Sequence, residues 1–203
     1  MKLWNHRSAM CKAGFILLAL IWASPAQAHI QKGEVGGFTS GFAHPWSGWD
    51  HILAMVAVGI WGAQLGAPAI WMLPVAFPMV MAVGGFLGLI GVPLPGTEIG
   101  IAVSALLLGL MVFREQKANL TLACILVGIF GLFHGHAHGT ELPPGQSGLY
   151  YSMGFVIATG TLHGLGISLG LIHRWPVGRT VLRTAGMVIL LAGAFFLCEA
   201  LKA

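Results

Sequence analysis

The sequence predicts an all-α, polytopic membrane protein: a bundle of six transmembrane helices that follow a cleavable signal peptide. Composition supports this first, because 57% of the 203 residues are hydrophobic and only 8% are charged, unlike a water-soluble domain. Distribution supports it second, because the hydrophobic residues gather in runs of roughly the 20 residues that a spanning helix needs. The length leaves no room for a separate soluble domain beside them.

The first 28 residues have the three parts of a signal peptide. The basic start contains Lys2, Arg7 and Lys12, an apolar stretch covers residues 15–23, and Ala26-Gln27-Ala28 forms a small-x-small cleavage signal. Cleavage there leaves a single domain, residues 29–203, that begins at His29. The alternative is an uncleaved first transmembrane helix. In both cases the N-terminus is exported.

Six apolar runs follow and are interpreted as the spanning helices: 49–65, 68–92, 98–113, 118–133, 147–172 and 180–201. The first starts after Gly48, and the second lies between two segments rich in glycine and proline. A charged REQK segment separates the third from the fourth, a PPG turn precedes the fifth, and RWP precedes the sixth. Pro74 and Pro78 should kink the second helix, which a bundle tolerates where a neighbouring helix satisfies the freed carbonyl.

Charge predicts the orientation in the membrane. The third-to-fourth and fifth-to-sixth connections hold Arg114, Lys117, Arg174 and Arg179. Basic connections stay in the cytoplasm, so the mature N-terminus of this inner-membrane protein is expected in the periplasm. Without residues 1–28, which hold three basic and no acidic residues, the formal charge falls from +4 to +1, so nothing indicates a nucleic-acid partner. The isolated Cys11, Cys124 and Cys198 indicate neither a disulfide framework nor a thiolate metal site.

The motif HPWSGWDH begins at His44 and contains two histidines and an acid. Seven helical residues would separate His44 from His51 by about 10 Å, so a break near Gly48 is needed if both bind one ion. Two interpretations of Asp50 remain open. With Ser47 it fits a capping box, and it is also a candidate ligand that can hold a ligating imidazole in place.

The motif FHGHAHGTE contains three histidines and an acid within eight residues. On a helix, His134 and His138 stand one turn apart and Glu141 falls on the same face, a spacing that can chelate one ion. His136 would then point away, whereas an extended segment would align all three histidines. Two glycines weaken the helix prediction, so both conformations stay open. We expect the two motifs to build one site, with the first and fourth mature helices adjacent.

Three further residues are candidates at lower specificity. Glu98 starts a helix, where the helix dipole favours a carboxylate, and it is also expected on the periplasmic face with the histidines. His29 would combine a free α-amine with an imidazole after cleavage, although a free tail is the alternative. His163 lies deep in the fifth helix, where an ionisable residue indicates function or a hydrogen bond between helices. The candidate metal ligands are His29, His44, Asp50, His51, Glu98, His134, His138 and Glu141.

The two motifs resemble the HPxxGxDH and FHGxAHGxE signatures of the HupE/UreJ family of nickel/cobalt permeases, and every fixed position matches. The resemblance extends over the whole chain. It implies a secondary permease, not an enzyme, that carries nickel or cobalt as its substrate for hydrogenase or urease, with no other cofactor. It also implies which residues transport needs: His44, Asp50, His51, His138 and Glu141.

Two other classes remain as alternatives. An intramembrane metal-dependent hydrolase or oxidase could use the same histidines, although the sequence lacks HExxH and an evident nucleophile. A metal-binding protein at the periplasmic face would bind the ion without moving it. No GxxxxGK[ST] segment is present, so the chain carries no nucleotide-driven motor of its own. The sequence leaves the oligomeric state open.

Overall fold

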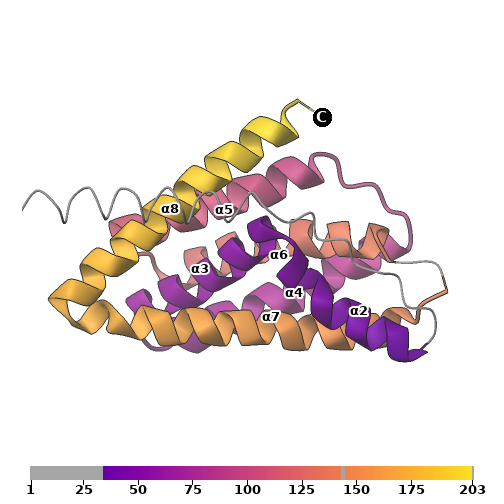
Figure 1. Cartoon of the computed structure of the whole chain (residues 1–203), viewed down its shortest axis with the longest axis horizontal. Coiled ribbons are helices and arrows are strands. Elements are labelled where there is room, and N and C mark those ends of the chain that lie inside the picture. Colours follow the sequence, from indigo (N-terminus) through magenta and orange to yellow (C-terminus); the bar gives the residue numbers. More distant parts are fainter. Residues whose placement is uncertain (1–33, 143–144, 203) are drawn as a thin grey trace, which may run out of the picture.

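The computed structural model describes residues 34–142 and 145–202, which are helical with short connections and contain no β-strand in those ranges. The signal peptide and His29 lie outside the described residues. The helices are α2 (Glu34–Ser47), α3 (Trp49–Leu65), α4 (Ala69–Leu89), α5 (Thr97–Arg114), α6 (Leu120–Thr140), α7 (Gly148–Gly170) and α8 (Pro176–Ala200), with a 3₁₀ turn at Leu171–Arg174 (Figure 1).

All six expected helices are present with small shifts at their ends. The largest difference is at α6, which continues to Thr140 and therefore includes the whole second motif. Of the two conformations left open for that motif, the helical one is confirmed.

One helix, α2, was not expected. Three glycines and Pro45 lie within its 14 residues, a composition with poor helix propensity. The helix forms because it packs on α7, where Gly41 lies against the backbone of Tyr151 and Gly154 lies against the backbone of Phe38. Propensity alone does not reveal such a helix, since its stability comes from tertiary contact.

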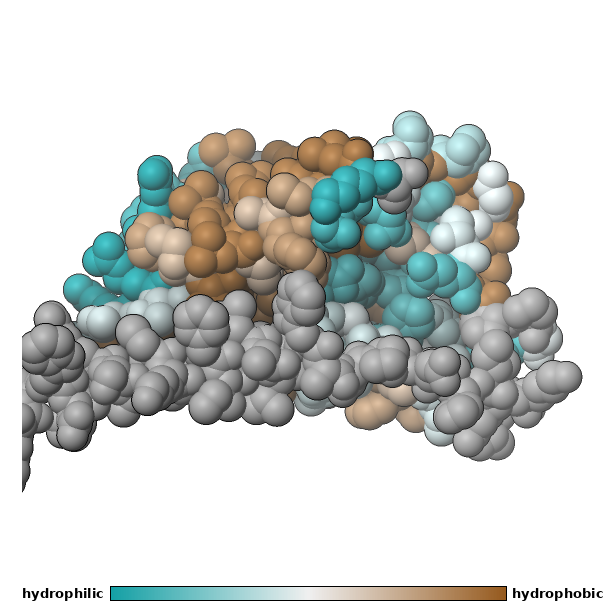
Figure 2. Space-filling model, turned by 45° about the horizontal axis from the view of Figure 1, so that its top comes forward, coloured by the Kyte–Doolittle hydropathy of each residue, from teal (hydrophilic) through white to brown (hydrophobic). Residues whose placement is uncertain are grey.

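The described part of the chain forms a multi-pass membrane protein. Five helices, α4 to α8, are long and apolar enough to cross a membrane. On α4 an exposed apolar stripe runs along one face at helical spacing: Trp71, Val75, Met79, Val83 and Phe86. Hydrophobic side chains cover the middle of the visible face in Figure 2, and hydrophilic ones lie toward its ends.

The expected first span, 49–65, corresponds to α3, which has 17 residues and is therefore shorter than the five helices α4 to α8. It is the most enclosed helix of the bundle, with ten of its last twelve residues buried, from Ala54 to Gln64. It packs against α7, α5 and α4. The prediction of six spans therefore stays a prediction for this one helix.

Glycines allow the closest helix pairs, α4 with α6 and α5 with α8. At Gly131, Gly135 and Gly139 of α6 an added Cβ atom would collide with the backbone of α4. Such close approach is typical of helices that associate in lipid.

Two ends of the bundle are used as reference points below. The motif end holds the end of α6 and the start of α7, toward the right of Figure 1. The basic end holds the connections that contain Arg114, Lys117, Arg174 and Arg179.

Candidate metal site

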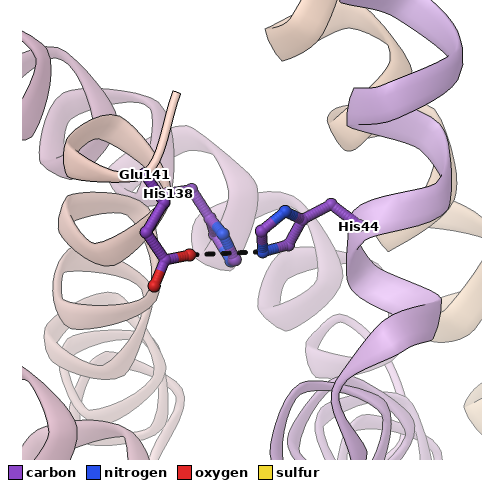
Figure 3. Close-up of side chains that lie close together, drawn as sticks. All are labelled: His44, His138 and Glu141. Carbon is purple, nitrogen blue, oxygen red and sulfur yellow. Dashed lines mark ion pairs between the residues drawn. The ribbon is translucent and has the colours of Figure 1, made fainter. Parts of the chain in front are cut away.

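Three side chains from both motifs point toward one another at the motif end (Figure 3). His44 comes from α2, His138 from α6 and Glu141 from the residue position that follows α6. One donor atom of each lies within 4.8 Å of the other two, and His44 Nε2 lies 3.4 Å from Glu141 Oε2. Donors bound to one ion at about 2 Å lie roughly 3–4 Å apart, so a small movement of these side chains completes a shared set.

The expected break near Gly48 is confirmed. Gly48 has an extended backbone, with φ −111° and ψ 123°, and it separates α2 from α3. This break lets His44 and His51 face the same region, with ring centroids 6.3 Å apart. His44 precedes α3, and it lies in the last turn of the unexpected helix α2.

The capping-box interpretation of Ser47 and Asp50 is wrong. Gly48 is the N-cap of α3 and makes no side-chain cap, while the Ser47 hydroxyl donates to the His44 carbonyl, 2.6 Å away. Ser47 is the last residue of α2, so its hydroxyl bonds a carbonyl of α2 and does not cap α3.

Asp50 holds the imidazole of His51 instead. Its Oδ1 atom accepts from the His51 backbone N–H at 2.9 Å and from His51 Nδ1 at 2.8 Å. A proton on Nδ1 leaves a lone pair on Nε2, and this buried atom has no hydrogen-bond partner among the described residues. A carboxylate that orients an imidazole in this way is typical of metal-binding histidines.

His134 is oriented by a residue that the sequence analysis did not single out, Ser104 of α5. The Ser104 hydroxyl donates to the Ile101 carbonyl at 2.6 Å, so it has no second proton to give to His134 Nε2, 2.8 Å away. Nε2–H must therefore donate to Ser104, which leaves a lone pair on Nδ1. Within the described ranges, this buried Nδ1 has no partner either. The sequence did offer one signal for Ser104, because it is a single serine in an otherwise apolar run.

The imidazoles form a row that leads into the bundle. Ring centroids lie 4.5 Å apart for His44 and His138, 4.6 Å for His138 and His51, and 4.9 Å for His51 and His134. The row runs from two partly exposed side chains, 54% for Glu141 and 29% for His44, to the buried His138, His51 and His134, the last of which is 0% exposed. We call the four histidines together with Glu141 the histidine row.

The expected adjacency of the first and fourth mature helices needs correction. The helix α3 packs mainly on α7 and α5, and α6 packs mainly on α4. The two motifs meet through their side chains across the space between α3 and α6. An imidazole side chain extends well beyond its helix backbone. The two motifs can therefore touch through their histidines although α3 and α6 do not pack closely on each other.

Other predicted residues lie elsewhere. His136 points away from the row, as a helical motif requires, and its Nε2 lies 2.7 Å from the carbonyl of Val92. Glu98 is exposed in the first turn of α5, and no hydrogen bond or ion pair joins it to another described residue. The structure therefore does not bring Glu98 into the row.

A cavity of about 400 Å³ between α4, α6 and α7 also reaches His138. Its other lining residues are mostly apolar, among them Met81, Phe86, Leu89 and Phe155. A hydrated cation gains nothing from such walls, whereas the Glu141 carboxylate and His44, which also lie beside His138, offer it donor atoms.

Fold and site together define a multi-pass membrane protein with a buried row of imidazoles that opens at one end of the bundle. The chain belongs to the HupE/UreJ family, since the family described as HupE / UreJ protein matches residues 17–196. Its curated relatives include Protein HupE of Rhizobium leguminosarum bv. viciae, which is 48% identical over 181 residues, covering 89% of this chain and 94% of the relative. No solved structure matches the chain.

Proposed function

We propose that this protein is a secondary permease that takes up nickel, and also cobalt, across the inner membrane, with its motif end in the periplasm. The observation that carries the proposal is the histidine row, in which donors of both motifs lead from an exposed carboxylate to fully buried imidazoles. Membership of the HupE/UreJ family supports the same class of protein.

The donors of the row suit this substrate. Imidazole nitrogen favours nickel, cobalt, zinc and copper over magnesium and calcium, which prefer oxygen ligands. Glu141 and His44 would capture the ion at the mouth, and His138, His51 and His134 would replace its water stepwise. A membrane potential, negative inside, favours inward movement of a dication by about 4.6 kcal/mol per 100 mV.

The neutral imidazoles of the histidine row also suit release of the ion. Asp50 and Ser104 each hold one ring nitrogen and leave one lone pair on His51 and His134. A row of single donors gives several weak positions in place of one closed cage, and an ion that must leave needs weak binding at each step.

Uptake of radioactive nickel tests the proposal. Cells that lack their own nickel transporters and express this protein should accumulate ⁶³Ni above a vector control, and excess cobalt should compete. Urease activity at limiting nickel, in a host that contains urease, should rise in parallel. Nickel binding by the purified protein without accumulation in cells would instead identify a metal-binding protein or an enzyme.

A further inference from the structure

His163 lies outside both motifs, deep in α7, and its side chain is 1% exposed. Its Nδ1 lies 3.2 Å from the carbonyl of Pro74 in α4. That carbonyl lacks its regular helical partner, because the residue four positions on is Pro78, which has no N–H. The carbonyl can only accept, so His163 Nδ1 carries the proton and donates it.

The other ring nitrogen of His163 is thereby available. With the proton on Nδ1, Nε2 of the neutral ring has a lone pair, and this buried atom has no hydrogen-bond partner in the part of the chain that the structure describes. The arrangement is the same as in His51 and His134: one nitrogen donates to an acceptor of the protein and the other stays free. Histidines that bind metals are oriented in this way.

A hydroxyl oxygen lies one turn before His163 on the same face of α7. Thr159 is 0% exposed, and its Oγ1 has no partner among the described residues. Threonines and serines in this helix usually bond their own backbone, as Thr161 does to the Ile157 carbonyl at 2.9 Å. Thr159 does not, so a second buried atom that could bind an ion lies one helical turn from His163.

Phe77 of α4 connects this position with the histidine row. The centroid of its buried ring lies 5.5 Å from that of His134 and 5.4 Å from that of His163. Both imidazoles therefore contact the same aromatic ring, His134 toward the motif end and His163 toward the basic end.

We propose that His163 Nε2, with Thr159 Oγ1, is an inner binding position for the dication, which the ion reaches from His134 past Phe77. The role in transport rests on the proposed function, whereas binding at His163 does not. Two protein donors, completed by water, hold an ion weakly, which suits a position that the ion leaves toward the basic end. The rival role is structural, a hydrogen bond that satisfies the Pro74 carbonyl.

Two substitutions of His163 separate these roles. His163→Asn keeps a side-chain N–H near Nδ1 for the Pro74 carbonyl but removes the lone pair of Nε2, and His163→Ala removes both. We expect ⁶³Ni uptake to fall about tenfold or more in both variants, as for lost metal-binding groups. Near wild-type uptake by His163→Asn, with a loss in His163→Ala alone, would show the structural role and overturn the proposal.

His173→Asn is the matched control. His173 also places Nδ1 2.9 Å from a backbone carbonyl, that of Gly170, but it is only half-buried. Nickel uptake by the His173→Asn variant should equal that of the wild type. Should His163→Asn not fold, Thr159→Val keeps the shape and removes the oxygen, and we expect lower uptake than in Thr161→Val. Equal uptake by the two threonine variants would then contradict the proposal.

A binding measurement decides the inner position independently of transport. In the purified full chain carrying His51→Ala and His138→Ala, titration with Co²⁺ alone should show residual binding through the visible absorption bands of the ion. Adding His163→Asn should weaken this binding, and any remainder should come from His44, His134 and Glu141. A triple variant that binds as well as its parent, or a parent that binds nothing, would overturn the inner position. Failure of the wild type to accumulate nickel would overturn only the proposed function.

Discussion

At the scale of single residues, the site depends on the groups that hold the imidazoles. Asp50 accepts from His51, Ser104 accepts from His134 and the Pro74 carbonyl accepts from His163. Each acceptor places the ring proton on one nitrogen, so the other nitrogen presents its lone pair without any cost of reorganisation when an ion arrives. His138 differs, because neither of its buried nitrogens has a partner within the described residues.

The first prediction concerns the shared use of the histidine row. His51→Ala and His138→Ala should each reduce nickel uptake nearly to background, because each removes a ring that contacts the other at 4.6 Å between centroids. Residues that act as a unit are non-additive, so the double variant should be little worse than either. His173→Ala should be almost silent. Uptake that survives His138→Ala in a correctly inserted protein would show that the second motif is only structural.

The second prediction concerns Ser104, which touches no ion itself. Ser104→Ala removes the acceptor of His134 Nε2–H, so the ring loses its fixed tautomer and orientation. Uptake should fall about 10- to 100-fold, the usual effect of losing a group that orients a metal-binding histidine. Ser168→Ala is the control, because the Ser168 hydroxyl is exposed and bonds the Gly164 carbonyl of its own helix. Equal rates for both variants would exclude the orienting role.

At the scale of helices, the second motif has two faces with different tasks. Its histidines at 134 and 138 face the row, while Gly135 and Gly139 lie against the backbone of α4. Close packing on one face thus holds the imidazoles of the other in position. The glycines of the motif need no part in binding, and the helix they seemed to weaken is stabilised by the contacts they allow.

The third prediction follows from that packing. In Gly135→Ala the added Cβ atom would collide with the backbone carbonyl of Met81, so α6 must move away from α4. Overpacking of this kind costs about 1–3 kcal/mol, and the thermal midpoint of the detergent-solubilised protein should fall. Gly160→Ala adds the same atom where nothing lies within 4 Å, and it should leave the midpoint unchanged. A stable Gly135→Ala protein would contradict the close α4–α6 contact.

At the scale of the whole molecule, the two ends of the bundle differ in chemistry. The motif end carries the histidines of both motifs with Asp50 and Glu141, and the basic end carries Arg114, Lys117 and Arg179. Because basic connections usually stay in the cytoplasm, we expect the motif end, and with it the mouth of the row, to face the periplasm.

The fourth prediction tests the orientation. In a cysteine-free background, an impermeant thiol reagent added to intact cells should label Pro95→Cys, which lies in an exposed connection at the motif end. It should not label Arg114→Cys or Arg179→Cys, both exposed at the basic end, until the membrane is permeabilised. Labelling of the arginine positions from outside would reverse the orientation.

Several features of the fold and of the candidate site could be predicted from the sequence alone. Spanning helices follow from composition and run length, and the predicted third span, 98–113, agrees with α5 to within one residue at each end. Hydropathy needs no knowledge of contacts, because lipid imposes helices on long apolar runs. The helix α2 was missed because its stability comes from packing on α7, which the sequence does not reveal. Two dense motifs also sufficed to group His44, His51, His134 and His138.

Tertiary structure decided what the motifs left open. Ser104 meets His134 across 30 residues of sequence and His163 meets the Pro74 carbonyl across 89, and neither pairing follows from local spacing. Glu98 shares the motif end with the histidines yet stays out of their row, because helix rotation, not position along the chain, directs a side chain. The sequence thus predicted which residues could bind a metal, and packing determined which of their side chains lie together in the histidine row.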